Sequence, residues 1–323
     1  MNKKHFYSLL VVFALSVMAC AKAAVSSGTD KETIIFAVKG QDTLRLDKYQ
    51  KREPQAVSPK PVVLFAFGGG FKAGERDRKD YIPFFEFLAE NGYVVVSTDY
   101  RPALKKADRS QLASVQGFVA SLQNAIYTAV EDFFDATHYI IKHSKDWNVD
   151  INQMVASGSS AGAITALQAE YELCNRTELT KRLPDAFHYA GVVSFAGAIC
   201  NLGSLQWKEK PCPLMMFHGD ADRTVPYEKA VIEGLGGLWG SAHIVKQLVG
   251  MGTSYYFYNV ENRGHVIADS PMQNNKYDVL SFLYNQVLKK QKQAIVTNEC
   301  VPGEAPAKKD FTLTDYIREN MNE

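Results

Sequence analysis

The feature that most constrains the fold is an apolar run, Val62 to Phe67, that ends in three consecutive glycines. Such a run, without alternation, is typical of a strand buried on both faces of a parallel sheet. Similar runs return at residues 93–98, 153–157, 189–195, 213–218 and 254–259, and helical periodicity separates most of them, at 81–90, 115–143 and 270–290. Strands that alternate with helices predict an α/β domain with a mostly parallel sheet and helices on both faces.

Two further strands are expected before this pattern begins. Residues 32–38 and 42–49 are strand-like and are separated by Lys39-Gly-Gln, which predicts an antiparallel hairpin. The prediction is therefore an eight-stranded sheet in one domain over residues 24–294. The tail, 295–323, is polar and contains two prolines. We expect it to wrap the surface and to be fastened there through Cys300.

The N-terminus has the pattern of an export signal. Lys3 and Lys4 precede a ten-residue apolar run, Leu9 to Met18, which is too short to span a bilayer. Ala21-Lys-Ala23 resembles a signal-peptidase site, which gives a signal peptide over residues 1–23. Val17 to Cys20 resembles a lipobox instead, in which Cys20 would carry a lipid anchor. Both alternatives predict an exported protein that is periplasmic, secreted or lipid-anchored to a bacterial cell envelope.

Export affects how the four remaining cysteines are interpreted. Thiols that reach an oxidising compartment tend to pair, so we expect at least one disulfide among Cys174, Cys200, Cys212 and Cys300, with Cys200–Cys212 as the attractive pair. The alternative is that they are buried free thiols. No Cys/His spacing suggests a metal site, so no metal is predicted. The net charge of +1 argues against a nucleic-acid partner.

Reactive residues follow several of the predicted strands, at the edge where an α/β sheet binds ligands. Gly158-Ser-Ser-Ala-Gly162 fits G-x-S-x-G, and only Ser160 has a glycine two positions away on both sides. This is the pattern of a nucleophile elbow, with the alternative of an unreactive glycine-serine turn. After a later strand, either Asp220 or Asp222 could supply the carboxylate that orients a catalytic imidazole.

A histidine and a glycine loop complete the candidate site. His265 is the one histidine that follows a strand in a glycine-containing loop downstream of both Ser160 and Asp222. An imidazole can take the serine proton and return it to the leaving group. The glycines at 68–70 can direct backbone N–H groups toward an anionic oxygen. A phosphate site is the alternative, but no nucleotide-binding glycine motif follows.

Together these motifs resemble the α/β-hydrolases of the carboxylesterase and hormone-sensitive-lipase-like kind. The resemblance covers residues 33–290 and includes "FGGGF" (67–71), "STDYRPA" (97–103), "GSSAG" (158–162), "HGDADRTVP" (218–226) and "RGH" (263–265). It implies ester hydrolysis through an acyl-enzyme without a cofactor. Ser160, Asp222 and His265 would be the catalytic residues, and Gly69, Gly70 and Ala161 would form the oxyanion hole. Phe67 departs from the family, which usually has a histidine there.

The substrate is predicted less directly. The connection at 197–212 is short and polar, which predicts a minimal lid and an open cleft for a small-molecule or oligosaccharide ester. Phe71, Ser159 and Trp207 are the expected substrate contacts, although Trp207 is equally suited to packing. Gut bacterial acetyl and feruloyl esterases that act on plant polysaccharides are the subgroup we expect. A prolyl-oligopeptidase-like peptidase and a catalytically silent binding module are the alternatives.

Overall fold

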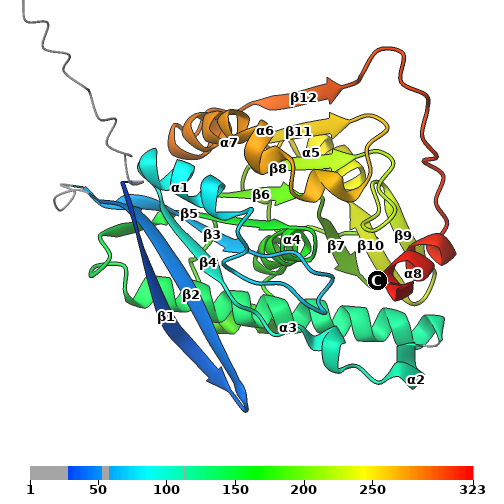
Figure 1. The fold of residues 1–323 in the computed structure, drawn as a ribbon, viewed down its shortest axis with the longest axis horizontal. Helices are drawn as coiled ribbons and strands as arrows, with labels where there is room; N and C mark the ends of the chain where they lie inside the picture. Colours follow the sequence, from blue (N-terminus) through cyan, green and yellow to red (C-terminus); the bar gives the residue numbers. More distant parts are fainter. Residues whose placement is uncertain (1–27, 53–57, 113, 323) are drawn as a thin grey trace, which may run out of the picture.

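In the computed structural model, which describes residues 28–52, 58–112 and 114–322, nine strands form the central sheet (Figure 1). Their order is β1-β2-β4-β3-β5-β6-β8-β11-β12. The strands are β1 (Thr29–Lys39), β2 (Asp42–Lys51), β3 (Lys60–Ala66), β4 (Val94–Thr98), β5 (Val149–Ser159), β6 (Gly191–Phe195), β8 (Leu214–Gly219), β11 (Tyr255–Val260) and β12 (Ala294–Glu299). The hairpin β1–β2 is antiparallel, and all pairs from β4 to β12 are parallel. The predicted α/β fold class is confirmed.

The ninth strand corrects the prediction of eight strands and of a domain that ends at residue 294. The strand β12 pairs with β11 from Tyr255 opposite Ala294 to Val260 opposite Glu299. It is an edge strand with mostly exposed side chains, so it has no continuous apolar run. The first part of the predicted tail therefore belongs to the sheet, and Cys300 directly after it is an exposed free cysteine that fastens nothing.

Eight α-helices, counted within the described ranges, surround the sheet. They are α1 (Ile82–Glu90), α2 (Arg109–Leu112), α3 (Val115–Lys142), α4 (Ala161–Asn175), α5 (Ser241–Met251), α6 (Pro271–Asn274), α7 (Lys276–Phe282) and α8 (Leu313–Asn322). Short helical turns are η1 (Ala103–Lys106), η2 (Glu178–Arg182) and η3 (His265–Ala268), and η4 (Leu283–Leu288) is a π-helix. The long helix α3 begins where the periodicity predicts, and the Ser114 hydroxyl caps it by accepting the Gly117 N–H at 3.1 Å.

The helix predicted over residues 270–290 is wrong as a single element. Pro271 lies in the first turn of α6, and Asn275 leaves helical geometry at φ −118° before α7 begins. The last part, η4, then widens into a π-helix. The apolar periodicity continues across these breaks because all three pieces bury their apolar residues on the same core, so the sequence pattern does not show them.

A second, three-stranded antiparallel sheet lies beside the carboxyl ends of the parallel strands, near α8 (Figure 1). It consists of β7 (Ala198–Asn201), β10 (Gly236–Gly240) and β9 (Lys229–Ile232). The sequence does not predict this sheet, since the glycines at 234, 236, 237 and 240 make the segment resemble a loop. In the described chain, this small sheet and the C-terminal helix are the elements that most resemble a lid.

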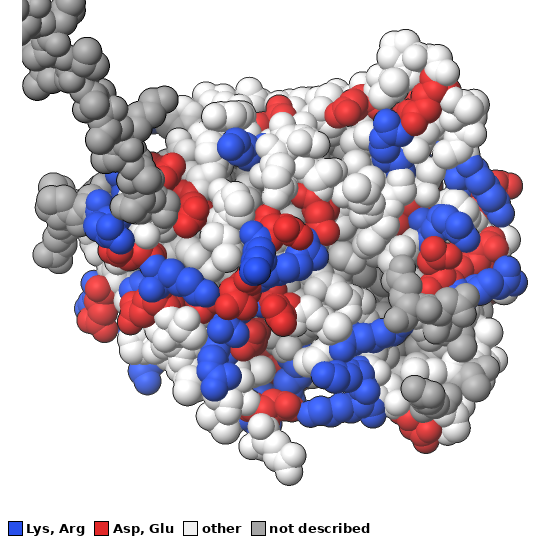
Figure 2. All heavy atoms as spheres, viewed as in Figure 1, with Lys and Arg blue, Asp and Glu red and all other residues white. Residues whose placement is uncertain are grey.

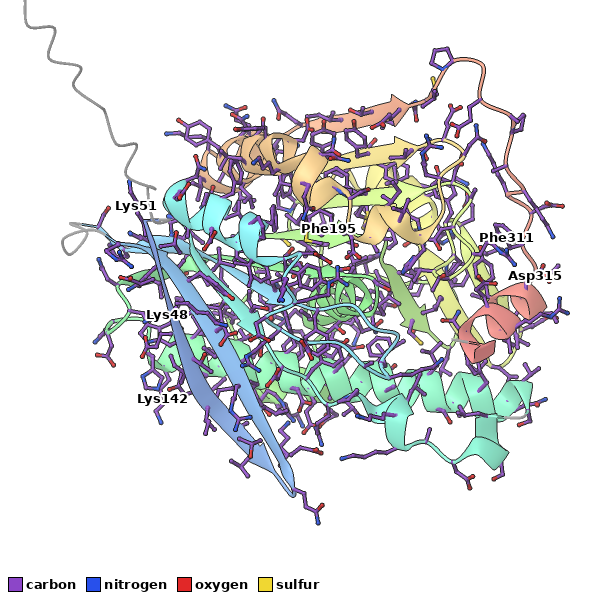
Figure 3. The ribbon with its side chains drawn as sticks, in the orientation of Figure 1. Lys48, Lys51, Lys142, Phe195, Phe311 and Asp315 are labelled. Carbon is purple, nitrogen blue, oxygen red and sulfur yellow. The ribbon has the colours of Figure 1, made fainter. Side chains whose placement is uncertain are left out.

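Stacked aromatic rings fill the core at the centre of the sheet. Phe195, labelled in Figure 3, stacks on Phe217 with ring centroids 5.3 Å apart and meets Phe84 edge-on at 5.8 Å. All three rings are buried. Such pairs add to the free energy gained by burying their surface. They join β6, β8 and α1 into one rigid layer beneath the carboxyl ends of the strands.

The surface carries both signs of charge. Lys and Arg side chains lie beside Asp and Glu side chains over much of the face in Figure 2, as expected for a net charge of +1. No helix in the described ranges has the length and apolar character needed to cross a bilayer. The predicted export signal over residues 1–23 and the anchor at Cys20 lie outside the described residues, so both stay predictions.

The four cysteines in the described part of the chain are free, which contradicts the predicted disulfide. The attractive pair, Cys200 and Cys212, is separated by α4. The Cys200 N–H donates to Gln168 at 2.8 Å, and the Cys212 N–H donates to Glu170 at 2.8 Å. Side chains two positions apart on a helix point in nearly opposite directions, so these two acceptors hold the cysteines on different sides of α4.

Glu170 itself is a buried carboxyl group with few partners. Its Oε1 accepts the Cys212 N–H at 2.8 Å and the Cys174 thiol at 3.4 Å, while its Oε2 has no partner among the described residues. Burial raises the pKa of Glu170 to about 7, although the bonds from Cys212 and Cys174 oppose the shift. The carboxyl is therefore protonated in the folded protein under mildly acidic conditions, where the unfolded chain is already ionised.

We predict that Glu170→Gln changes stability in a pH-dependent way. Because the folded-state pKa lies above the unfolded value of 4.5, the wild-type protein loses stability as the pH rises from 4.5 through about 7. The amide does not titrate. Relative to wild type, the variant should gain stability between pH 5 and pH 8, by on the order of 3 kcal/mol. Urea unfolding at both pH values measures this, and an equal difference at the two values would contradict it.

Candidate active site

Ser160 occupies a sharp turn between β5 and α4. Its backbone has φ 52° and ψ −117°, a conformation that L-residues rarely adopt. The two glycines of the motif allow this turn. A Cβ on Gly158 would lie 2.3 Å from the Gly162 carbonyl carbon, and a Cβ on Gly162 would lie 2.0 Å from the Ala66 carbonyl oxygen. The strand-turn-helix geometry therefore explains why the motif needs glycine on both sides of the serine.

Three side chains from distant parts of the chain meet at this turn. The Ser160 Oγ lies 2.7 Å from His265 Nε2, and His265 Nδ1 lies 2.7 Å from Asp222 Oδ2. His265 begins η3, just after β11, and Asp222 follows β8. The carboxylate at Nδ1 holds a proton on that nitrogen, which leaves Nε2 free to accept the serine proton. The structure thus brings together the three residues predicted to be catalytic.

Asp222 is completely buried and fully hydrogen-bonded. Its Oδ1 accepts the N–H groups of Thr224 at 2.8 Å and Val225 at 3.0 Å, and its Oδ2 faces His265. Burial acts to raise the pKa of the Asp222 carboxyl, but His265 and His218 together hold that pKa well below its usual range. The group is therefore an anion at neutral pH and can stabilise a protonated imidazole.

Asp220, the competing carboxylate, has a structural role. Its Oδ1 accepts the Asn262 N–H at 2.7 Å, and its Oδ2 pairs with Lys309 at 2.6 Å. It therefore ties the turn after β8 to the turn after β11 and to the C-terminal segment. No hydrogen bond in the described structure links Asp220 to His265, whose Nδ1 already faces Asp222.

His218 is a further site residue, and the sequence motifs do not identify it. It is completely buried at the end of β8, and its Nε2 lies 3.5 Å from Asp222 Oδ2 and 3.2 Å from the Val225 carbonyl oxygen. Its Nδ1 lies 2.8 Å from the Ser241 hydroxyl. Because Nε2 faces two acceptors, it carries the proton and donates toward the loop that holds Asp222. The sequence feature that could have identified His218 is its position at the end of a predicted strand, two residues before Asp220.

The glycine loop lies against the serine turn. The Gly68 N–H donates to the Tyr81 hydroxyl at 3.1 Å, and the Gly69 carbonyl accepts the N–H groups of Lys72 at 3.0 Å and Ala73 at 3.1 Å. A Cβ on Gly69, which has φ 139°, would lie 2.1 Å from the Ala73 oxygen. The loop is therefore closed on itself in a form that only glycine permits.

This loop and the start of α4 supply the predicted oxyanion donors. Gly69, Gly70 and Ala161 line the same cavity as Ser160 and His265. Among the described residues, the backbone N–H groups of these three have no hydrogen-bond partner. Such unengaged donors beside a nucleophile are what an oxyanion hole requires.

Phe67 fills the place where the family usually has histidine. Its ring stacks on Tyr100 with centroids 4.3 Å apart, and the Tyr100 hydroxyl donates to the Phe67 carbonyl at 2.9 Å. Both residues are buried. An aromatic pair therefore supports the start of the glycine loop in this chain, and the departure from the family leaves the loop closed.

The site opens into a cavity of ≈ 330 Å³. Its apolar lining, here called the apolar wall, comprises Phe71, Leu104, Phe118, Leu122, Ile164, Val225 and Leu238. Its polar lining, here called the polar side, comprises Lys72, Arg78, Thr224, Asp269 and Asn320. The volume lies near the small end of the range for ligand pockets, roughly 300–1,000 Å³. The cavity therefore offers both apolar surface and polar groups near Ser160.

Two of the three predicted substrate contacts line this cavity. Phe71 forms part of the apolar wall, and Ser159 donates its hydroxyl to Asp269 Oδ1 at 3.0 Å. The prediction for Trp207 is wrong. Its Nε1 donates to Gln247 at 2.7 Å, and its ring packs edge-on against Tyr171 at 4.9 Å, so it is a packing anchor outside the cavity.

Other residues of the polar side were not found from the sequence. Arg78 pairs with Asp269 at 2.6 Å and lies over the Tyr81 ring, 3.9 Å from its centroid. Asn320 comes from α8, where its Nδ2 donates to the Thr224 carbonyl at 3.0 Å and its carbonyl accepts from Lys72. None of these residues belongs to a motif, and Asn320 lies in the segment predicted to be a surface tail.

Comparisons with known proteins agree with this geometry. The family model BD-FAE, an esterase family of α/β-hydrolases, matches residues 46–206. The apo form of esterase 2 from Thermogutta terrifontis superposes with a TM-score of 0.57 at 19% identity, covering 80% of this chain and 94% of that one. The chain has the α/β-hydrolase fold. This assignment confirms the resemblance drawn from the sequence motifs.

Other proteins to which the chain is similar are esterases as well. The propionate-bound form of the same Thermogutta terrifontis esterase has a TM-score of 0.56 at 19% identity, covering 79% of this chain and 94% of that one. Esterase LipI of Mycobacterium tuberculosis (strain ATCC 25618 / H37Rv) is 30% identical over 106 residues, which is 33% of this chain. The match spans only 27% of LipI.

We predict that Ser160→Ala reduces ester hydrolysis by on the order of 10⁴-fold or more while the protein stays folded, because it removes the only group that attacks the carbonyl. Ser159→Ala is the matched control. It removes one hydroxyl in the same cavity and should retain most activity. Rates with p-nitrophenyl acetate measure both. A folded Ser159→Ala protein that is the less active of the two would show that the nucleophile is misassigned.

We further predict that Asp222→Asn lowers kcat by on the order of 10⁴-fold, because an amide can donate to Nδ1 and favour the wrong imidazole tautomer. Asp220→Asn should reduce kcat far less and act mainly on stability, since its partners are Asn262 and Lys309. Steady-state kinetics and thermal unfolding of both variants separate these effects. The opposite ranking in kcat would assign the acidic position to Asp220.

Proposed function

We propose that the protein is a serine carboxylesterase that hydrolyses short-acyl or aromatic-acid esters. The observation that carries the proposal is the continuous chain Ser160–His265–Asp222, with 2.7 Å at both hydrogen bonds, in a cavity that also contains free oxyanion donors. No cofactor is needed for this chemistry. The BD-FAE match and the esterase relatives support the same reaction class.

The proposed reaction has two symmetrical halves. The Ser160 Oγ attacks the ester carbonyl carbon while His265 Nε2 takes its proton, and the N–H groups of Gly69, Gly70 and Ala161 stabilise the oxyanion. His265 then donates that proton to the departing alcohol, which leaves an acyl-serine. In the second half, His265 Nε2 takes a proton from a water molecule, and the water oxygen attacks the acyl carbonyl carbon. His265 then returns the proton to the Ser160 Oγ, which releases the carboxylic acid and the free serine. Asp222 stabilises the imidazolium in both halves.

The apolar wall of the cavity suggests where the acyl group binds. Leu122, Ile164 and Leu238 border a space that suits a short or a compact aromatic acyl group. Propionate and butyrate are bound in structures of the Thermogutta terrifontis esterase, whose fold is similar. This similarity supports short acyl groups for the present chain as well.

The polar side suggests a hydroxyl-rich alcohol. Lys72, Arg78 and Asp269 can donate to or accept from sugar hydroxyls, although Arg78 and Asp269 are already paired with each other at 2.6 Å. We therefore propose acylated fragments of plant polysaccharides as substrates. The signal-like N-terminus supports an exported enzyme, with Cys20 as the site of a lipid anchor if the lipobox is used.

Assays with peptide substrates separate this proposal from its alternatives. A prolyl-oligopeptidase-like enzyme would cleave proline-containing p-nitroanilides faster than the matched esters. A silent binding module would hydrolyse no activated ester at all. Hydrolysis of p-nitrophenyl acetate that Ser160→Ala abolishes is the result expected of an esterase. Acetylated and feruloylated xylo-oligosaccharides, compared directly, would then identify the acid half.

We predict that kcat/KM for p-nitrophenyl acetate or butyrate exceeds that for the palmitate by at least about 100-fold, since the cavity of ≈ 330 Å³ is small. Leu122→Ala, which widens the apolar wall, should move the preference toward longer chains. Val296→Ala on the exposed face of β12 is the control and should change nothing. A kcat/KM for the palmitate equal to that for the acetate would contradict this prediction and indicate a lipase.

A further inference from the structure

A second cavity, of ≈ 710 Å³, lies at the opposite edge of the parallel sheet from Ser160. Its walls come from the segments that precede β5, β6, β8 and β11 or form their first residues, together with η4 and the residues that follow it. In a parallel sheet these segments gather at the amino edge, whereas the triad lies at the carboxyl edge. Figure 1 shows β6, β8 and β11 running in the same direction, so their starts share one edge. The cavity shares no lining residue with the active site.

The cavity contains buried polar groups that the described protein leaves unsatisfied. Gln286 is 1% exposed, and neither its Oε1 nor its Nε2 has a hydrogen-bond partner among the described residues. Thr253, 9% exposed, has an unpartnered hydroxyl as well. Both residues line this cavity. A buried amide without partners destabilises a fold, so its presence here calls for a reason outside internal packing.

Gln286 lies in η4, the one π-helix of the described chain. A π-helical turn costs stability and often occurs at functional sites. The π-helical turn and the unpartnered amide each lower the stability of the fold, and both occur at Gln286. Both are explained if a ligand in the cavity supplies the missing hydrogen bonds.

The charge around the cavity indicates what kind of ligand this is. Lys210, Lys290 and Lys292 line it, and no aspartate or glutamate does. Within the described ranges, none of these three lysines has an ion-pair partner. Glu209, beside Lys210 in the sequence, is already paired with Arg176 and His188. The three ammonium groups therefore favour an anionic ligand.

Other features indicate a polyol. An amide offers a donor and an acceptor together, which suits hydroxyl groups that can do both. Pro184, Pro211 and Pro213 form apolar parts of the wall, against which the C–H face of a sugar ring can pack. A neighbouring cavity of ≈ 260 Å³ shares Gly252, Thr253, Ser254 and Lys292 with this one, so the binding surface extends beyond a single ring.

We propose that this amino-edge groove binds an anionic oligosaccharide whose sugar rings bear carboxylates, with Gln286 and Thr253 bonding to hydroxyls and the three lysines pairing with the carboxylates. The site would hold acidic polysaccharide away from the catalytic centre. The inference does not depend on the proposed esterase activity, because it uses no residue of the triad.

Isothermal titration of the full chain with trigalacturonate tests the proposal. We expect saturable binding that is at least about ten-fold tighter than binding of xylotriose, which has no carboxylates, and that weakens with added salt. The double variant Lys290→Ala/Lys292→Ala should lose at least about ten-fold in affinity. Lys289→Ala is the matched control, because Lys289 lies over the Tyr284 ring and does not line the groove.

Gln286→Leu gives the sharpest readout. The proposal predicts weaker trigalacturonate binding together with an unchanged or higher Tm, because leucine removes a buried unsatisfied amide of similar size. Thr253→Val, which is isosteric, is the second variant and should also weaken binding. Ser160→Ala should bind as the wild type does, whether or not the protein is an esterase.

Several outcomes would overturn the proposal. These are equal affinity for xylotriose and trigalacturonate, equal losses in Lys289→Ala and the double variant, or unchanged binding in both Gln286→Leu and Thr253→Val. Inorganic phosphate that competes fully at the same concentration as trigalacturonate would reduce the groove to a simple anion site and would also overturn it.

Discussion

The close approach of Gly162 to the end of β3 is the contact on which the active site depends. A Cβ on Gly162 would lie 2.0 Å from the Ala66 oxygen, so only glycine lets α4 begin beside β3. That position forces Ser160 into its positive-φ turn and places the glycine loop, which continues from β3, directly against it. The Ser160 N–H donates to Phe195 at the end of β6 at 2.9 Å. Three neighbouring strands thus fix the serine before any side chain of the triad contributes.

The charge on Asp222 and the C-terminal helix α8 complete the site that the backbone positions. Asp222 stays ionised at 0% exposure because two backbone N–H groups and two imidazoles surround it. The loop that carries it is covered by α8, where the Tyr316 hydroxyl donates to the Asp222 carbonyl at 3.4 Å. Phe311 and Asp315, labelled in Figure 3, mark where this helix begins. The segment that resembles a tail in sequence therefore covers a buried charge and lines the cavity through Asn320.

The sequence predicted those parts of the molecule that depend on local pattern. Buried parallel strands have continuous apolar runs, and the nucleophile turn needs glycines at fixed spacing, so eight strands and Ser160, Asp222 and His265 were identifiable. Elements that depend on tertiary contacts were missed. The edge strand β12 is polar, the small sheet is rich in glycine, and Trp207 lies in a loop and is held by Gln247 of α5 and Tyr171 of α4. The cysteines also needed the structure, because α4 separates Cys200 from Cys212.

The two edges of the parallel sheet place different demands on the chain. At the carboxyl edge, the polar side chains of Ser160, His265 and the buried Asp222 bond to one another, so their hydrogen bonds stabilise the fold as well as the proposed chemistry. At the amino edge, Gln286 and Thr253 have no such partners among the described residues. The loops there are attached to the starts of strands whose other ends hold the triad. A ligand can therefore occupy the amino edge without displacing Ser160 or His265, because the two cavities share no lining residue.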